Sequence, residues 1–331
     1  MFWHTDRKSR IKFNESMKDN YFHICIASEK EVMFRTDNDY RRAFNCLALA
    51  VHDTNSVLLA DAIMSNHIHF CVQTTNPGEL VRLFRNSYQR YFNAKYLRNG
   101  MLGDRGHTQV ALPDPTHNIV AITYVLRNPL HHGVCTTPFE YKHSSVRVYF
   151  RKSLGNELPG IGHKVSLRQS NMPSNRQLPK GFSLDDKGQI LRDSVIDVRH
   201  VENLFGTPQD FIIDMARYST KKWRNSLANG LNDNNLISLE SIESNRYLES
   251  VLEKNEHGKC VKTPYSDIFI CNQIDNVLLP QIDLRSVYQM NIQQKLATGR
   301  MLHSRYHCSL SQLGRCLAAT DDSFYRLFFT R

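Results

Sequence analysis

The order of apolar and polar positions predicts short strands and longer helices in the first half of the chain. The stretch 57–74 contains two apolar, strand-like runs that meet at Ser65-Asn66, and both residue types favour turns. A third run predicts a strand over 21–28, and a shorter strand is expected over 107–112. Apolar residues at helical spacing predict helices over 39–52, 79–96 and 117–128.

The last of these helices has signals at both ends. Thr116 is suited to cap its N-terminus, and Pro129, which lacks a backbone N–H, is expected to end it. Its apolar stripe includes Ile122 and Leu126, and Tyr124 projects almost opposite that stripe. We therefore expect Tyr124 to lie off the face that packs.

The second half of the chain has a different pattern. The stretch 151–193 is rich in Ser, Gly, Pro, Asn and Lys, which is typical of a linker between a first domain over 1–150 and a helical region over 194–331. Helical patterns in that region cover 198–205, 208–223, 246–254, 287–304, 309–318 and 321–329. The last three resemble a helix-turn-helix at 287–331, although a plain packing or dimerisation unit has the same pattern.

Composition narrows the class of protein. A chain of 331 residues suggests about two domains, and a net charge of +10 favours a polyanionic partner such as nucleic acid. The eight cysteines include no C-x-x-C pair, which argues against a zinc ribbon and fits reduced thiols. No apolar run has the length needed to cross a bilayer, and the N-terminus lacks the apolar region of a signal peptide. We expect a soluble, cytoplasmic protein.

The helix over 79–96 concentrates positive charge and aromatic residues. Five of its polar side chains are candidates for contacts to a nucleic-acid backbone: Arg82, Arg85, Gln89, Arg90 and Lys95. A basic helix with interleaved aromatic residues suits single-stranded nucleic acid. The alternative is a solvated cationic face backed by tyrosines of the core.

Two stretches contain residues suited to chemistry. Side chains two apart on a strand share a face, so His67 and His69 provide half of a metal site, although such a pair also occurs as hydrogen-bonded core. Tyr124 and Asn128 lie one helical turn apart, close enough to face one site. An Asn before proline is also common at the end of a helix.

These stretches carry a resemblance to a known family. The segment 64–70 (MSNHIHF) contains a His-hydrophobic-His motif, and 124–130 (YVLRNPL) contains a tyrosine followed by Asn-Pro. Together, in this order, they resemble the single-tyrosine HUH transposases of bacterial insertion sequences, and among them the REP-associated tyrosine transposase type. The resemblance covers roughly 20–150.

The resemblance implies a fold and an activity. The fold would be α+β, an antiparallel sheet with flanking helices of the ferredoxin-like HUH endonuclease type. Tyr124 would attack single-stranded, hairpin-containing DNA and form a 5′-phosphotyrosine. His67, His69 and Asn128 would hold Mg²⁺ or Mn²⁺. Arg127 would contact DNA, the protein would be a homodimer in a bacterial cytoplasm, and no small-molecule cofactor is expected.

Two other functions fit the same residues. A DNA-binding or regulatory protein could keep the fold without cutting DNA. A phosphohydrolase or zinc hydrolase could use the His67 and His69 pair, but it would need a further acidic ligand, for which Asp61 in the preceding strand is the nearby candidate.

Overall fold

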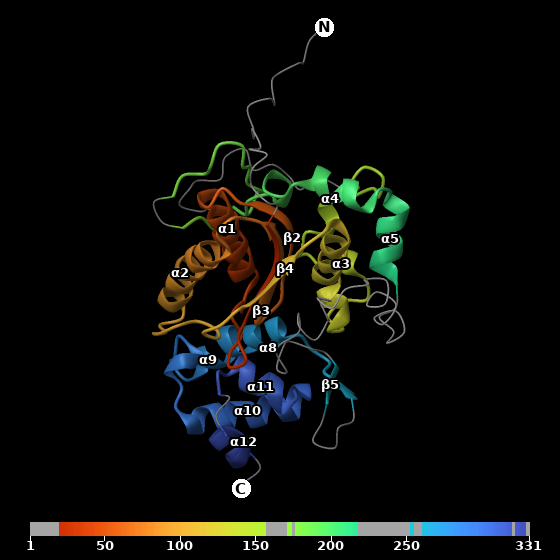
Figure 1. The fold of residues 1–331 in the computed structure, drawn as a ribbon. Coiled ribbons are helices and arrows are strands. Elements are labelled where there is room, and N and C mark those ends of the chain that lie inside the picture. Colours follow the sequence, from red (N-terminus) through yellow and green to blue (C-terminus); the bar gives the residue numbers. More distant parts are fainter. Residues whose placement is uncertain are drawn as a thin grey trace.

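The computed structural model describes residues 20–156, 171–173, 176–217, 252–254, 260–319 and 322–328. A four-stranded sheet in the order β2-β3-β1-β4 lies at the centre of the first part of the chain (Figure 1). Its strands are β1 (Tyr21–Ala27), β2 (Val57–Ile63), β3 (His67–Gln73) and β4 (Thr108–Leu112). All three neighbouring pairs are antiparallel, so the predicted antiparallel sheet is confirmed.

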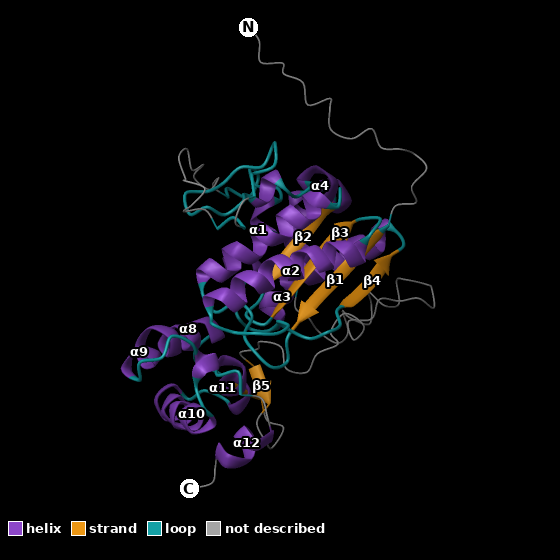
Figure 2. Ribbon diagram, turned by 90° about the vertical axis from the view of Figure 1, so that its left-hand side faces the viewer, coloured by secondary structure: helices purple, strands orange, loops and turns teal. Residues whose placement is uncertain are grey.

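Helices cover both faces of the sheet. α1 (Asp37–Asp53) and α2 (Pro77–Lys95) lie on one face and α3 (Pro115–His131) lies on the other (Figures 1 and 2). α1 starts at a capping box in which Thr36 accepts from the backbone of Asp39, and Asn76 caps α2. The predicted strands, and the helices over 39–52 and 79–96, therefore occur within a few residues of their expected positions.

The ends of α3 differ from the prediction. Asp114 rather than Thr116 caps the helix, because the Asp114 side chain accepts from His117 N, which leaves Pro115 in the first turn. Pro129 lies inside the helix, which continues to His131. A proline so close to the C-terminus removes only one backbone hydrogen bond and does not stop the last turn.

Tyr124 is buried, contrary to the expectation that it lies off the packing face. Only 7% of the residue is exposed, because α3 packs against the sheet on one side and against α5 (Pro208–Ala216) and α4 (Val198–Phe205) on the other. A helix that is covered on two sides has no single packing face, so its apolar stripe does not mark which residues are exposed.

Much of the expected linker is packed against the first core. Ile190 is fully buried, and Asn45 Nδ2 donates to Gly188 O at 2.9 Å. Arg192 forms a buried ion pair with Asp61. α4 and α5 join the same core through side chains such as Phe211. The first core therefore extends well past residue 150, while 157–170 and 174–175 lie outside the described residues.

Two further helix predictions fall partly outside the described residues. The predicted helix over 208–223 is observed as α5, and residues 218–251 are not described. At the end of the predicted helix over 246–254 the chain is extended instead, because Leu252–Lys254 forms β5, which pairs with β6 (Cys260–Lys262). The extended conformation is stabilised by pairing with β6, which lies outside the segment predicted to be helical.

The C-terminal residues form a second hydrophobic core. Its helices are α8 (Asp267–Gln273), α9 (Leu279–Gln281), α10 (Ile292–Tyr306), α11 (Leu310–Cys316) and α12 (Asp322–Phe328). A π-helical turn, Ile274–Leu278, joins α8 to α9, and Ser309 caps α11, because its side chain accepts from Gln312 N. Most of α11 is buried, which favours packing over insertion into a DNA groove; a helix-turn-helix at 287–331 stays a prediction.

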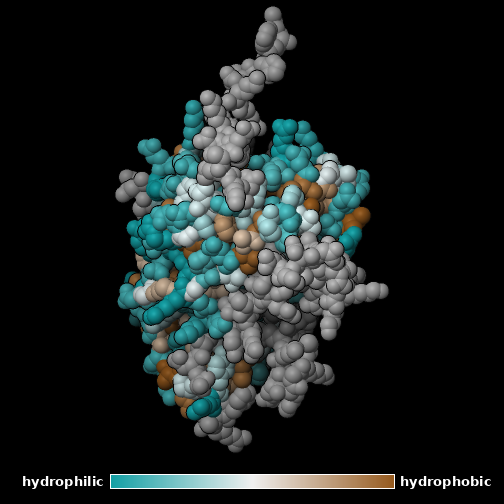
Figure 3. Space-filling model, in the orientation of Figure 1, coloured by the Kyte–Doolittle hydropathy of each residue, from teal (hydrophilic) through white to brown (hydrophobic). Residues whose placement is uncertain are grey.

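The surface adds two observations. On the face shown in Figure 3 the described surface is mostly hydrophilic, with small hydrophobic spots rather than one broad patch. Within the described ranges, none of the helices combines the length and the apolar character that a bilayer crossing requires.

Candidate active site

Two adjacent strands direct histidines to the face of the sheet that α3 covers. In the β1–β3 register Cys25 lies opposite His69 and Ala27 lies opposite His67. Because side chains alternate along a strand, His23 and Cys25 share this face with His67 and His69. All three histidines are fully buried. The sequence pair is therefore part of a larger histidine cluster.

His69 has neighbours at both ring nitrogens. Its Nδ1 atom lies 3.1 Å from His23 Nε2, and its Nε2 atom lies 3.8 Å from Cys25 Sγ. The His23 and His69 rings are stacked with centroids 5.2 Å apart. His23 was not predicted from the sequence, because a single strand does not indicate which other strand it pairs with. The available signal was that His23 and Cys25 lie two positions apart in the run 21–28 and so share one face of the strand.

α3 places Tyr124 over these histidines. The Tyr124 ring lies 5.3 Å from the His69 ring and 5.9 Å from the His23 ring, nearly perpendicular to both. One turn further, Asn128 Nδ2 donates to the Tyr124 hydroxyl at 3.4 Å. Tyr124 and Asn128 thus face one site, as their spacing predicts.

His67 is held in one tautomer by the turn before it. Asn66 Nδ2 donates to Ser28 O at 2.9 Å, which fixes Asn66 Oδ1 as the acceptor that faces His67 Nδ1 at 3.0 Å. Burial lowers the pKa of His67 to about 4, so the ring is neutral and carries a single proton. With Asn66 in this orientation the proton is assigned to Nδ1, which leaves a lone pair on Nε2.

This lone pair meets a second acceptor. His67 Nε2 lies 2.9 Å from Asn128 Oδ1, so in the orientation described two acceptors face each other in a fully buried place. Ligand atoms at about 2.1 Å from an octahedral cation lie about 3.0 Å apart, so the pair fits a shared divalent ion. The same distance also fits a rotated Asn128 amide that donates to His67.

The full predicted ligand set is brought close together. The His67 and His69 rings lie 5.1 Å apart, and the His132 ring, which was not predicted, lies 5.4 Å from His67. Among the residues that the structure describes, no three His, Cys, Asp or Glu side chains are arranged to hold a metal ion. A cation here would depend on the amide oxygen of Asn128, and His69 as a ligand stays a prediction.

The predicted nucleic-acid contacts lie elsewhere. α2 covers the face of the sheet opposite α3, so its basic side chains are not gathered around Tyr124 (Figure 1). All five predicted contact residues of α2 have partners within the chain: Arg82 pairs with Glu79, Arg85 and Arg90 donate to backbone carbonyls, Lys95 pairs with Asp39, and Gln89 accepts from Leu102 N. Arg127 on α3 is buried and donates to Arg217 O. Their contacts to DNA stay predictions.

Asp61 is not a ligand of the histidine pair. In the β2–β3 register Asp61 lies opposite Phe70, on the other face from His69, and it forms a buried ion pair with Arg192 at 2.9 Å. Because the carboxylate points away from the histidines, the hydrolase that would use it is excluded.

Comparisons with known proteins add one structural likeness. No family model and no curated protein matches the chain. A solved structure of a REP-associated tyrosine transposase bound to a REP hairpin aligns with a TM-score of 0.36 and 10% sequence identity, covering 49% of this chain and 95% of that chain. The likeness spans part of the chain and does not place it in that family.

Proposed function

We propose that the protein is a metal-dependent single-stranded DNA endonuclease and transposase with Tyr124 as its nucleophile. One observation carries this proposal. The Tyr124 hydroxyl, the Asn128 amide and His67 Nε2 form a continuous row of close polar contacts beside His69. This is the set of residues that the resemblance to HUH transposases assigns to cleavage.

Tyr124 would carry the covalent step. Its hydroxyl oxygen forms a bond to phosphorus while the bond between phosphorus and O3′ breaks, the phenol proton leaves, and O3′ takes up a proton. The products are a 5′-phosphotyrosine and a free 3′-hydroxyl, so the phosphodiester energy is kept for rejoining. Asn128 orients the Tyr124 hydroxyl through its amide.

The neighbouring residues would prepare the site for a divalent ion. His67 Nε2 and Asn128 Oδ1 are the atoms best suited to hold Mg²⁺ or Mn²⁺, with His69 as the third ligand. When bound, such an ion neutralises charge that develops on the scissile phosphate. Asn66 keeps the His67 lone pair directed toward this position.

The wider proposal covers the fold and the partner. The four-stranded antiparallel sheet with helices on both faces is compatible with an HUH endonuclease fold. We infer hairpin-containing single-stranded DNA as the substrate and a homodimer as the active form. The residues proposed for cleavage all lie within 1–150, the range predicted for the nuclease domain, and the core that supports them extends past residue 150. The net charge of +10 suits a DNA partner.

A second function is favoured by one observation. His67 and His69 are fully buried and Tyr124 is 7% exposed, so in this conformation a DNA phosphate does not reach the hydroxyl without movement. A non-cutting DNA-binding or regulatory protein on the same fold would need no such access.

Covalent capture separates the two functions. The full chain is incubated with labelled single-stranded oligonucleotides that contain hairpins, with Mn²⁺, and run on a denaturing gel. A nuclease gives a slow-migrating adduct that is lost in Tyr124→Phe and with chelator, and is kept in Tyr265→Phe, a control in the C-terminal part of the chain. DNA binding without adduct or cut, with oligonucleotides that include the DNA sequences flanking the gene for this protein, favours the regulatory function.

A further inference from the structure

The C-terminal helices share a buried polar interface with the first domain. They pack below the end of the sheet at which β3 begins (Figure 2). Val32, from the loop after β1, belongs to the C-terminal core, and its N–H donates to Arg315 O at 3.3 Å. Arg35, whose side chain is fully buried, donates to both carboxylate oxygens of Asp275 at 2.9 and 2.7 Å. The two parts are therefore joined by specific contacts.

A further contact of this interface involves Ser65, in the turn before His67. Ser65 Oγ donates to Asp267 Oδ2 at 2.8 Å, across 202 positions of sequence. Arg315 donates to both oxygens of the same carboxylate, and Gln312 Nε2 donates to Oδ1 at 3.1 Å. All four residues are buried. Asp267, held by α11, is thus a fixed acceptor for Ser65.

The contact continues to the His67 ring through the backbone of the turn. Ser65 O accepts from Met33 N at 2.8 Å and from Phe34 N at 2.9 Å. The next residue, Asn66, presents Oδ1 to His67 Nδ1. A displacement of Ser65 would move Asn66, whose amide fixes the tautomer of His67.

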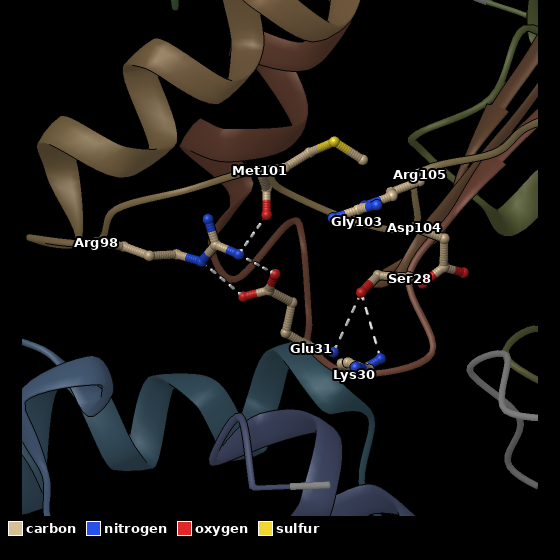
Figure 4. A pocket seen from close by; sticks show the side chains of 8 residues that line it. All are labelled: Ser28, Lys30, Glu31, Arg98, Met101, Gly103, Asp104 and Arg105. Atoms are coloured by element: carbon tan, nitrogen blue, oxygen red, sulfur yellow. Dashed lines mark hydrogen bonds and ion pairs between the residues drawn. The ribbon is translucent and has the colours of Figure 1, made fainter.

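The loop that follows β1 is also held by polar contacts at this interface. Figure 4 shows Ser28 Oγ, which accepts from the backbone of Lys30 and Glu31, and the ion pair between Arg98 and Glu31. These residues line a pocket of ≈ 410 Å³. From the C-terminal helices, the Tyr288 hydroxyl donates to Glu31 Oε2 at 2.6 Å. Tyr288 therefore makes a contact at the same interface that does not touch the His67 turn.

We propose that Asp267 is a positioning residue for His67, which acts through Ser65 and Asn66. The C-terminal helices are then part of the active-site support rather than a separable DNA-reading module. The inference rests on the proposed function for its catalytic meaning, but the positioning itself is a property of the metal-free protein. The competing explanation is that Asp267 only stabilises its own helices through Arg315.

The experiment compares Ser65→Ala, Asp267→Asn and the matched control Tyr288→Phe in the full chain. Each loses a polar interaction of the same interface, which is buried for Ser65 and Asp267 and partly buried for Tyr288. Ser65→Ala leaves the pairing of Asp267 with Arg315 intact. Long-range ¹H–¹⁵N spectra of the histidine rings in metal-free protein report the tautomer of His67. Titration with Mn²⁺ reports affinity, and covalent capture on DNA reports activity.

We expect wild type and Tyr288→Phe to show His67 protonated only on Nδ1. Ser65→Ala and Asp267→Asn should show mixed tautomers and a loss of Mn²⁺ affinity of about 10-fold. If Asp267→Asn does not fold, Ser65→Ala decides alone. A folded Ser65→Ala with unchanged ring nitrogen shifts and affinity overturns the positioning role. Mixed tautomers in Ser65→Ala and Asp267→Asn, together with a wild type that forms no DNA adduct, would support positioning and contradict the proposed function.

Discussion

His23 and His69 come from neighbouring strands, and their facing ring nitrogens lie 3.1 Å apart in a fully buried cluster. Between two neutral imidazoles only one of the facing nitrogens carries a proton, so each ring determines the tautomer of the other. Ligand histidines are commonly oriented by a hydrogen bond at the second ring nitrogen. His23 is the residue in position to do this for His69.

Replacing His23 by Phe keeps an aromatic ring of similar size and removes this hydrogen bond. If His69 binds the ion, Mn²⁺ affinity and the rate of adduct formation should fall about 10- to 100-fold. Cys25→Ala is the matched control, because it removes the neighbour of the other nitrogen, and it should retain affinity. Isothermal titration and covalent capture measure the two effects. Equal losses in both variants would argue against a role for His23 in orienting His69.

Substitutions of Asn128 distinguish the two explanations of its contact with His67, which are a shared divalent ion and a rotated amide. If a cation lies against both acceptors, Asn128→Asp supplies a stronger ligand and Asn128→Ala removes one. Mn²⁺ at 100 times its dissociation constant stabilises the folded state by about 2.7 kcal/mol. Melting curves should therefore shift upward with Mn²⁺ in wild type and Asn128→Asp, and not in Asn128→Ala.

The rotated amide gives the opposite result for this series. Without a cation, Asn128→Asp buries a carboxylate whose neighbours are the His67 lone pair and the Tyr124 hydroxyl. Burial of an unpaired charge is strongly unfavourable, so this variant would melt below wild type with or without Mn²⁺. That pattern would remove Asn128 from the ligand set.

Much of the first domain follows from local pattern, because its strands and helices have clear periodicity and end signals. The turn at Ser65-Asn66 and the shared face of His67 and His69 were correctly predicted from the sequence. The contacts that complete the site were not, since they join distant positions: His23 reaches His69 across 46 residues and Ser65 reaches Asp267 across 202. Periodicity gives the face of an element but not its partner.

The packed linker illustrates the same limit. Polar composition suggested an exposed segment, yet Arg192 is buried against Asp61, and its guanidinium lies 4.2 Å from the centre of the Phe44 ring. An arginine in a polar stretch gives no local sign that a carboxylate 131 positions earlier will neutralise it. The composition therefore indicated correctly that the segment is polar, but it did not indicate that part of the segment packs into the core.

The Asp61–Arg192 pair should be strongly coupled to stability. Asp61→Asn leaves a buried guanidinium without its counter-charge, and the loss of one partner in such a pair costs about 3–5 kcal/mol. Urea unfolding followed by circular dichroism should show this as a lower midpoint. The exposed Arg82–Glu79 pair provides the control, and Glu79→Gln should leave the midpoint unchanged. A midpoint that is unchanged in Asp61→Asn would show that the pair is not buried in solution.

Acid should destabilise the fold through neutral buried histidines, and His143 provides the test. Burial lowers the pKa of His143 to about 4, although its Nε2 atom lies 3.2 Å from Asp37 Oδ1, and its ring stacks on Tyr40 with centroids 4.0 Å apart. Between about pH 4 and 6.5 the unfolded chain binds a proton at this residue that the folded chain does not. Its contribution to stability is therefore complete above about pH 6.5 and is lost as the pH falls toward 4.

Replacing His143 by Gln removes one titrating group from this window. The free energy of unfolding of wild type should change more steeply with pH than that of His143→Gln, by about 1.4 kcal/mol per pH unit within the window. His23, whose pKa burial lowers to about 3, should maintain part of the slope in both proteins. Urea unfolding at pH 4.5, 5.5, 6.5 and 7.5, sampled across and above the window of about 4 to 6.5, measures the two slopes. Parallel curves would mean that His143 is solvated or protonated in the folded protein, and its stacking on Tyr40 would then need another explanation.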